Sequence, residues 1–399
     1  MKKRKTTAVL WLLLISAVLA FCGCERGKNT AAPTAASTPA LTPSITPTPT
    51  ITPTPTNTPT PTETPTPTET PTPTLDPDSP EGHLEALRPF ETYETNVDGH
   101  HTWNPHVFGI FHDKFYEADG FKQTFFNLVD ALIAGEDSFE CASGKAYVWC
   151  TGGRLLDRFF PPAMLCLADV SADEGYANGR GKIVLTVPKE ELAARIAEFE
   201  SIVTGILDDA VGDDYNDFEA AISLYDYICR NWEYDYAEVA GQKYGEEEDP
   251  SLNDQVFRCF KERKGICWEI SSVYAYLLMQ LGMDADGISA DSDSDGHEWT
   301  ALRLGDKWYN ADPTWGLSKY GTNISYYLFN EDERVEDGFY RDSFAVAGWD
   351  TGKYANYGIV MNNTVSEFRD SMYFGINREK KTVIIRNLSG DYEAIPYVE

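Results

Sequence analysis

Basic residues are scarce in this chain of 399 residues, which has 33 lysines and arginines against 63 aspartates and glutamates. The formal net charge of −30 repels phosphate backbones and anionic lipid headgroups, so nucleic-acid binding is disfavoured. No glycine-rich loop that could cradle a phosphate is present, and no second hydrophobic run could span a membrane. With 13% aromatic residues the chain is nevertheless unlike a disordered or fibrous protein, so it can bury a core.

Histidine is also scarce, and its six copies are unevenly placed. Five of them lie within residues 83–112, so His297 is the only histidine in the rest of the chain. The early group, with His100 next to His101, could suggest a metal site, but no cysteine or carboxylate spacing supports one. We interpret it as a polar, aromatic-rich entry segment and expect neither a metal nor a cofactor.

Proline is rare outside one segment, because 15 of the 23 prolines lie between Pro33 and Pro80. Thr-Pro repeats fix φ and remove hydrogen-bond donors, so this segment cannot pack into a core and favours extended polyproline II. We predict that residues 24–80 form a disordered Thr/Pro-rich linker. Whether it is a semi-rigid stalk or a flexible tether is left open, and either way it is a spacer.

The first residues have the pattern of an export signal. Basic residues at positions 2–5 precede an apolar run from Ala8 to Phe21, which is shorter than the ~20 residues of a membrane-spanning helix. Gly23-Cys24 resembles the cleavage site of bacterial lipoproteins, which implies a signal peptide at 1–23 and a lipid on Cys24. We expect a protein anchored to the outer face of the cell membrane through this lipid alone; the alternative is an ordinary secretion signal.

The globular part begins near residue 81. Residues 81–213 are predicted to be an N-terminal α/β region of unknown role, with a helix over 121–133 and a strand over 183–187. Apolar residues at helical spacing predict two further helices, one over 192–206 and one over 218–232. These stripes are interpreted as core.

A helix start carries a candidate nucleophile, Cys267. The apolar positions from Ile270 to Leu281 predict a helix that Gly282 ends. Cys267 lies in its first turn, where the N–H groups carry partial positive charge and favour a thiolate. Taken alone, such a cysteine is more commonly a core residue.

A predicted hairpin brings His297 together with an aspartate. Strands over 297–304 and 307–312 flank the two-residue turn Gly305-Asp306. With Leu304 opposite Lys307, Trp299 faces Asp312, and His297 is the diagonal neighbour of Asp312. A thiolate that attacks a carbonyl, an imidazole that shuttles the proton and a carboxylate that orients the imidazole are the parts of an acyl-transfer site. The backbone N–H of Cys267 could help to bind the oxyanion.

Three blocks around these residues resemble the transglutaminase-like superfamily of papain-related thiol enzymes. They are Gly265-Ile266-Cys267, Gly296-His297-Glu298-Trp299 and the run from Trp308 to Trp315, which contains Asp312-Pro313-Thr314-Trp315. The resemblance implies an α+β fold, with the catalytic Cys267 at a helix N-terminus packed on an antiparallel sheet that carries His297 and Asp312. It covers about residues 214–330, the predicted catalytic core, and residues 331–399 are expected to add strands and loops to the same domain. The gap of 30 residues between Cys267 and His297 argues against papain-type proteases themselves, where it is about 130–150.

We therefore predict a cell-surface thiol enzyme that acts on protein or peptide amides through an acyl-enzyme on Cys267. Hydrolysis by a peptidase or amidase is favoured over transfer to an amine, which would form a crosslink. The alternative is a catalytically silent surface binding or scaffold protein of the same fold. We expect a monomer with a protein or peptide substrate.

Two smaller features carry weaker predictions. Asp291–Gly296 matches the first half of a calcium loop, but Leu302 stands where the bidentate glutamate is required, so we interpret it as a solvated acidic connection that favours cationic or neutral substrates. Among the five cysteines of the globular part that remain when Cys267 is set aside, Cys141 and Cys150 are nearest in sequence and hence the first candidates for a disulfide.

Overall fold

The computed structural model describes residues 79–90, 97–239, 255–293, 296–318, 321–347, 353–362, 364 and 366–397. The predicted signal peptide, Cys24 and the Thr/Pro-rich linker lie outside them. The described residues from Leu87 onward form one compact unit, and the described residues before Leu87 belong to another. The first described elements are α1 (Pro80–Leu87) and η1 (Arg88–Phe90). None of the described helices is both long and apolar enough to cross a membrane.

A five-stranded antiparallel sheet carries the predicted hairpin. Its strand order is β10-β8-β7-β6-β11. The bounds are β6 Ala285–Asp291, β7 Gly296–Leu304, β8 Lys307–Ala311, β10 Tyr327–Phe329 and β11 Ala345–Val346. Leu304 pairs with Lys307, so the predicted register is confirmed. Gly305 in the turn has φ of 60°, a conformation that glycine adopts without steric cost.

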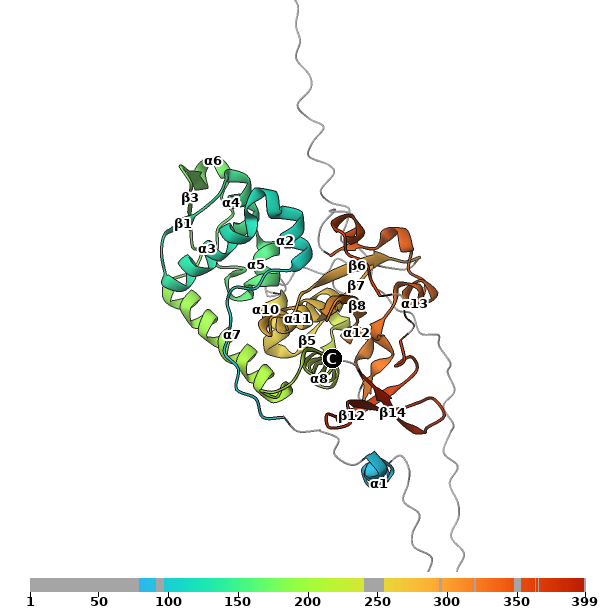
Figure 1. The fold of residues 1–399 in the computed structure, drawn as a ribbon. Coiled ribbons are helices and arrows are strands. Elements are labelled where there is room, and N and C mark those ends of the chain that lie inside the picture. The colour runs from blue at the N-terminus through green and yellow to red at the C-terminus, as the bar shows by residue number, and fades with distance from the viewer. Residues whose placement is uncertain are drawn as a thin grey trace, which may run out of the picture. The chain divides into compact units, whose positions relative to one another are not determined.

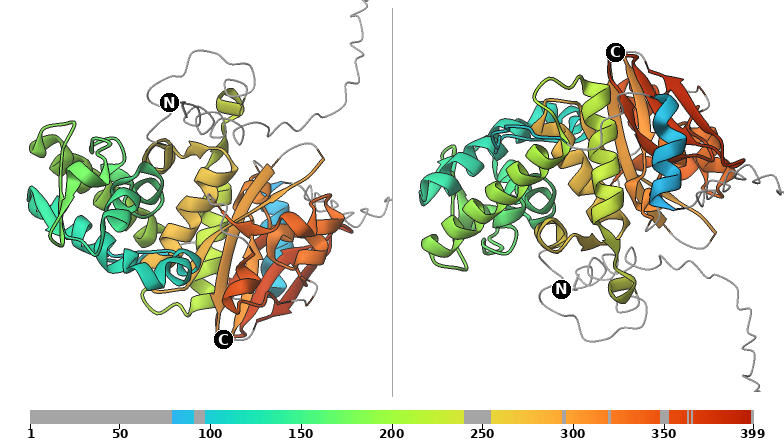
Figure 2. Two further views of the ribbon diagram at one scale, coloured as in Figure 1. Left: turned by 90° about the horizontal axis from the view of Figure 1, so that it is seen from above. Right: turned by 90° about the horizontal axis from the view of Figure 1, so that it is seen from below.

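A layer of helices covers one face of this sheet (Figures 1 and 2). Its members are α8 (Asp217–Asn231), α10 (Gln255–Glu262), α11 (Cys267–Gln280) and α12 (Pro313–Gly316). Nearly every residue of α11 is buried, because the helix packs on β6 and β7 and also contacts α5, α8 and α10. Gly282, with φ of 81°, follows the end of this helix, as predicted.

The N-terminal half of the unit lies on the far side of this helix layer, shown in teal and green in Figure 2. It consists of α2 (Ile110–Tyr116), η2 (Glu117–Asp119), α3 (Phe121–Ala134), β1 (Ser138–Glu140), α4 (Gly144–Thr151), α5 (Gly153–Phe159), η3 (Pro161–Ala163), α6 (Ala172–Gly175), β2 (Tyr176–Ala177), β3 (Arg180–Lys182) and α7 (Lys189–Ala210). Strands β1, β3 and β2 form a small sheet in that order.

The helices predicted in this part of the chain are confirmed, but the strand predicted over 183–187 is wrong. Only Leu185 forms a bridge, to Leu167, and the regular strand lies just before, in β3. A loop lies beside the apolar run and makes only isolated backbone hydrogen bonds with it: the Ala168 N–H donates to the Val184 carbonyl, and the Thr186 N–H donates to the Cys166 carbonyl. The apolar, β-branched run over 183–187 therefore lacks the partner strand that a continuous row of backbone hydrogen bonds needs.

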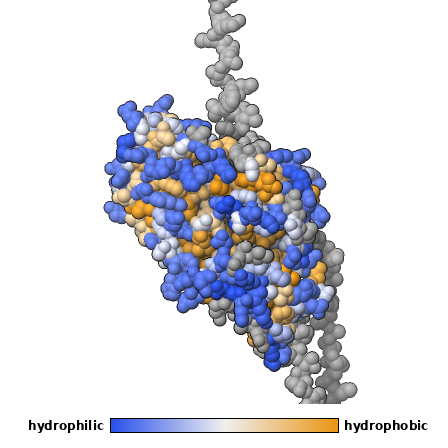
Figure 3. Space-filling model, viewed as in Figure 1, coloured by the Kyte–Doolittle hydropathy of each residue, from blue (hydrophilic) through white to orange (hydrophobic). Residues whose placement is uncertain are grey.

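The remaining elements follow the catalytic sequence blocks or flank them. They are β4 (Glu233–Tyr234), β5 (Lys264–Gly265), β9 (Thr322–Asn323), η5 (Ile324–Tyr326), α13 (Glu331–Glu336), η6 (Arg341–Ser343), η7 (Tyr354–Tyr357), β12 (Met372–Asn377), β13 (Thr382–Arg386) and β14 (Tyr392–Pro396). The C-terminal strands form a sheet of order β14-β13-β12-β9, while β4 and β5 pair in parallel. Hydrophilic side chains dominate the face drawn in Figure 3, with apolar patches between them.

The proposed disulfide is not formed. Cys141 donates its Sγ–H to the Ser143 carbonyl, whereas Cys150 on α4 donates to the Phe121 carbonyl on the neighbouring helix. Burial raises the pKa of both thiols. Closeness in sequence misled the prediction, because the helix that begins at Gly144 turns the two side chains toward different partners.

Candidate active site

Cys267 begins α11, as predicted, and only 6% of its surface is exposed. The chain enters the helix through β5, which pairs with β4. Ile266 is extended, and its N–H donates to the carboxylate of Glu269 at 2.8 Å. Gly265 packs so closely that a Cβ there would lie 2.7 Å from both Cys259 Sγ and Glu269 Oε2. The backbone before the cysteine is thus held by a strand on one side and by its own helix on the other.

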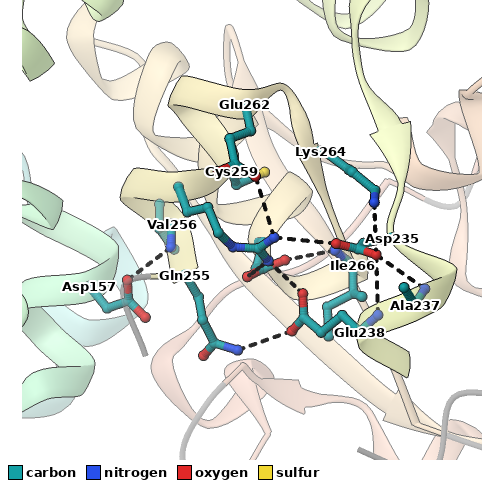
Figure 4. Close-up of polar contacts among 12 residues, drawn as sticks. Asp157, Asp235, Ala237, Glu238, Gln255, Val256, Cys259, Glu262, Lys264 and Ile266 are labelled. Carbon is teal, nitrogen blue, oxygen red and sulfur yellow. Dashed lines mark hydrogen bonds and ion pairs between the residues drawn. The ribbon is translucent and has the colours of Figure 1, made fainter. Parts of the chain in front are cut away.

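A buried cluster of charges lies behind this helix start (Figure 4). Arg258 of α10 contacts Glu238 at 2.6 Å, Asp235 at 3.3 Å and Glu269 at 3.4 Å, and Lys264 contacts Asp235 at 3.2 Å. Burial raises the pKa of Glu269 well above its usual range, and the neighbouring Glu238 carboxylate raises it further. No sequence motif indicates this cluster. It anchors the residues on both sides of Cys267 to α10.

His297 lies on β7, which packs directly against α11. Thr300 of β7 donates its hydroxyl to the Ser271 carbonyl at 3.0 Å, and Ser271 Oγ donates to Glu298 at 3.3 Å. Ser271 lies about one helical turn after Cys267. Candidate nucleophile and candidate base therefore come from two elements that contact each other side by side.

The predicted pairing of His297 with Asp312 is present. His297 Nε2 lies 2.7 Å from Asp312 Oδ2, and both side chains are buried. The ladder ends one residue earlier than predicted, since β8 stops at Ala311 and Asp312 caps the short helix α12 by accepting the Trp315 N–H at 3.2 Å. Because Nε2 contacts the carboxylate, proton exchange with a nucleophile would take place at the other ring nitrogen, Nδ1.

Arg334 is a component of the site that the sequence analysis missed. It is fully buried on α13, and its Nη2 donates to Asp312 Oδ2 at 2.6 Å. Burial alone would raise the pKa of Asp312, but the charges of His297 and Arg334 and the hydrogen bonds it accepts outweigh burial and lower it. Asp312 is therefore ionised at neutral pH. The segment Glu331–Glu336 is rich in charged residues, which is typical of a solvated surface, and nothing in it indicates a buried arginine.

A second arginine, Arg158 of α5, supports the site from the N-terminal half. It donates two parallel hydrogen bonds to Glu298, at 2.8 and 2.9 Å, and its guanidinium carbon lies 5.5 Å from the ring centre of Trp268. Glu298 follows His297 and Trp268 follows Cys267, so one side chain contacts the neighbours of both. Residues of the N-terminal half thus take part in holding the site, which no sequence motif indicated.

The early histidines do not converge on one point. Each contacts a different carboxylate: His100 with Asp213, His101 with Asp208, His106 with Asp130 and His112 with Asp286. In the part of the chain that the structure describes, no group of three or more His, Cys, Asp or Glu side chains could hold a metal ion. Within the acidic loop, Asp293 bonds the Tyr340 hydroxyl, while residues 294 and 295 lie outside the described part.

Chemically, the site combines a cysteine at a helix start with an imidazole whose far nitrogen is fixed by an ionised carboxylate. The helix N-terminus favours a thiolate, and the carboxylate favours an imidazolium beside it. Such a pair can attack a carbonyl carbon and later return a proton to the leaving group. The lipid-anchor candidate Cys24 lies outside the described residues and is not part of this arrangement.

Comparison with known proteins gives a family match and similar solved structures. Residues 205–313 match the family described as the Transglutaminase-like superfamily, and this segment contains all three candidate residues. A crystal structure of a TGase is 17% identical, with a TM-score of 0.27, over 33% of this chain and 35% of its own. A candidate cysteine protease from Cytophaga hutchinsonii is 15% identical, with a TM-score of 0.25, over 53% of this chain and 63% of its own. The chain thus spans less than two thirds of the length of either protein, and the likeness to the superfamily rests on the family match over residues 205–313. No curated protein matches the sequence.

Proposed function

We propose that this chain is a thiol enzyme whose Cys267 takes up the acyl group of a protein or peptide amide. The proposal starts from the premise that residues 205–313 form a transglutaminase-like domain. The observation that carries the proposal is the contact of His297 with Asp312 at 2.7 Å, on a strand that packs against the helix begun by Cys267. A binding or scaffold protein would have no need of this combination.

The proposed reaction proceeds in two halves. The thiolate of Cys267 attacks the amide carbonyl and forms a C–S bond; the C–N bond then breaks, and the imidazolium of His297 gives its proton to the departing amine. In the second half, His297 takes a proton from the incoming water or amine, which displaces Cys267 as a thiolate. Asp312 holds the ring in one orientation throughout, and the N–H of Cys267 is available to the oxyanion.

Hydrolysis and crosslinking differ only in the second nucleophile. Water yields a carboxylic acid and makes the protein a peptidase or amidase, whereas an amine yields a new amide bond. We favour hydrolysis, in keeping with the interpretation of the chain as an exported, lipid-anchored surface protein. A Thr/Pro-rich spacer after Cys24 would hold the enzyme away from the membrane, where surface proteins and peptides are its substrates.

The test compares wild type with Cys267→Ala and with Cys166→Ala, which removes another buried cysteine, one in the N-terminal half of the unit. A mixture of denatured protein substrates is incubated with a fluorescent primary amine, and both new peptide termini and amine incorporation are measured. We expect one of the two products with wild type and Cys166→Ala, and neither with Cys267→Ala. A product that persists in Cys267→Ala would contradict the acyl-enzyme.

Selective alkylation provides a test without any substrate. Iodoacetamide near pH 6–7 should modify Cys267 quickly in wild type and much more slowly in His297→Ala, as read by mass spectrometry of the Cys267 peptide. Equal, slow labelling in both proteins would instead favour the silent scaffold.

A further inference from the structure

Arg334 occupies an unusual position for a charged side chain. No part of it is exposed, and its guanidinium carbon lies 4.4–5.5 Å from the centres of five aromatic rings. These rings belong to Trp299, Trp315, Tyr326, Phe329 and Phe339. We call this group the Arg334 cage. Rings at this distance stabilise a cation through their π-faces and exclude water from it.

Few hydrogen bonds compensate the burial of this cation. Its Nε and Nη1 make no hydrogen bond with any described residue, and Nη1 lies 3.7 Å from Asp337 Oδ2. The one short contact is that of Nη2 with Asp312 Oδ2. Burial of a charge with so few partners is costly, and an apolar side chain of similar volume would fill the cage at lower cost. The charge itself therefore needs an explanation beyond packing.

The explanation lies in the shared oxygen. Asp312 Oδ2 accepts both from Arg334 at 2.6 Å and from His297 at 2.7 Å, so the guanidinium and the imidazole are bound to one atom. The cage rings surround both partners, since Trp299, Trp315 and Phe339 also lie within 5.3–6.2 Å of the His297 ring. In such a dry environment one cation strongly affects the protonation of another.

We propose that Arg334 is a positioning residue that, through Asp312, sets the pH range in which Cys267 and His297 form a thiolate–imidazolium pair. This inference rests on the proposed function. Arg334 supplies a permanent positive charge, which keeps Asp312 ionised and opposes excess stabilisation of the imidazolium. Asp312 alone, without a neutralising partner, would hold the proton on His297 too firmly for its transfer to the departing amine.

Several other titratable and charged groups face this arrangement. They are Tyr225 and Cys229 of α8, Tyr326 before β10, Glu333 of α13, Asp337 after α13, and Arg369, which contacts Asp337 at 3.3 Å and Glu333 at 4.0 Å. Burial raises the pKa values of Tyr225, Cys229 and Tyr326, so these three are neutral at neutral pH. Burial also raises the pKa of Asp337 above its usual range.

The experiment measures the rate constant for alkylation of Cys267 by iodoacetamide between pH 4 and pH 10 in the full chain. Loss of the cation makes the potential at the site more negative, which disfavours the thiolate and favours the imidazolium. The pH profile has one midpoint where the Cys267 thiolate forms and another where His297 loses its proton. Both midpoints should therefore move to higher pH in Arg334→Met, by about one unit. Methionine suits an aromatic cage, so packing is largely kept. Arg334→Lys, which retains the charge, should stay close to wild type.

Unchanged midpoints in Arg334→Met, with only a lower rate, would overturn the proposal, as would an equal displacement in Arg334→Lys. If Arg334→Met does not fold, Asp337→Asn decides, because it removes a negative charge next to Arg334. Its midpoints should move to lower pH, and a lack of movement would overturn the role of Arg334. The proposed function fails separately, and takes this inference with it, if wild type shows the single ordinary thiol profile of His297→Ala.

Discussion

Among the described residues, two histidine–aspartate pairs are buried, and the groups around them differ. His297 and Asp312 lie 2.7 Å apart, and His112 and Asp286 lie 2.8 Å apart, with all four side chains at most 6% exposed. In chemical composition the two pairs are the same. The difference between them lies in what else each carboxylate binds.

Asp286 binds mainly backbone N–H groups. Its oxygens accept the N–H groups of Phe111 at 3.0 Å, His112 at 3.2 Å and Gly287 at 2.9 Å, besides the His112 ring. Phe108 and Phe159 lie against the imidazole. The pair therefore fastens the first turn of α2 to β6, and it joins the N-terminal half to the central sheet.

Asp312 binds two side chains and only one backbone N–H group. It neutralises Arg334, orients His297 through Nε2 and caps α12, while Nδ1 of the ring remains for proton exchange. The comparison teaches that a buried histidine–aspartate pair does not by itself indicate catalysis. What distinguishes the His297–Asp312 pair is that its carboxylate also binds the buried Arg334 and that its imidazole lies on β7, which packs against the helix begun by Cys267, whereas His112 lies on α2.

The largest expected effect separates the pairs by activity. His297→Ala should lower the rate of the Cys267-dependent reaction by about 10³-fold, because it removes the group that accepts and returns the proton. His112→Ala, assayed at a temperature where it remains folded, should stay within about tenfold of wild type. The rate is measured as product formed per mole of folded protein. A similar loss in both variants would abolish the distinction drawn here.

Stability should separate the pairs in the opposite sense. His112→Ala leaves the buried Asp286 without its imidazole and opens a cavity between α2 and β6, so the free energy of unfolding should fall by about 3 kcal/mol. Denaturation in urea, followed by circular dichroism, measures this change. His297→Ala should cost less, because Arg334 continues to neutralise Asp312. The comparison fails if His112→Ala is as stable as wild type.

The lowered pKa of Asp312 predicts a smaller effect that depends on pH. A carboxylate whose pKa is lower in the folded chain stabilises the fold at pH values above its unfolded pKa of about 4, and the contribution is lost as the pH falls through the folded value. The difference in unfolding free energy between wild type and Asp312→Asn should therefore shrink as the pH falls below about 4. Asp286→Asn, which leaves Asp312 in place, is the matched control. A difference that does not depend on pH would count against an ionised Asp312.

The smallest effect belongs to an exposed pair of the same kind. His106 and Asp130 contact each other at 2.7 Å, but their side chains are 37% and 63% exposed. His106→Ala should change the free energy of unfolding by at most about 0.5 kcal/mol, since water screens the contact. A loss as large as that of His112→Ala would show that burial is not what separates these pairs.

Much of the site could be predicted from the sequence because its parts are local. A cysteine before an apolar stripe, and two strands joined by Gly305-Asp306, are set by backbone periodicity and turn chemistry, so α11 and the β7–β8 register came out as predicted. The pairing of His297 with Asp312 follows from that register. Even there the tertiary structure intervened, since Asp312 left the ladder to cap α12.

The supporting residues could not be predicted, because they come from distant parts of the chain. Arg334 reaches Asp312 across 22 positions and Arg158 reaches Glu298 across 140. In sequence each is an ordinary charged residue in a polar segment, and only the packing of α13 and α5 removes it from water.

Periodicity thus determines which elements form and which side chains share a face, because these depend on a few neighbouring residues. The candidate triad, the excess of acidic residues and the clustering of prolines can likewise be read from the sequence alone. The charge state of Asp312, the aromatic cage of Arg334 and the separate partners of the four early histidines were decided by tertiary structure alone. The reason is physical: desolvation and ion pairing depend on distances between groups, and only the folded chain sets those distances.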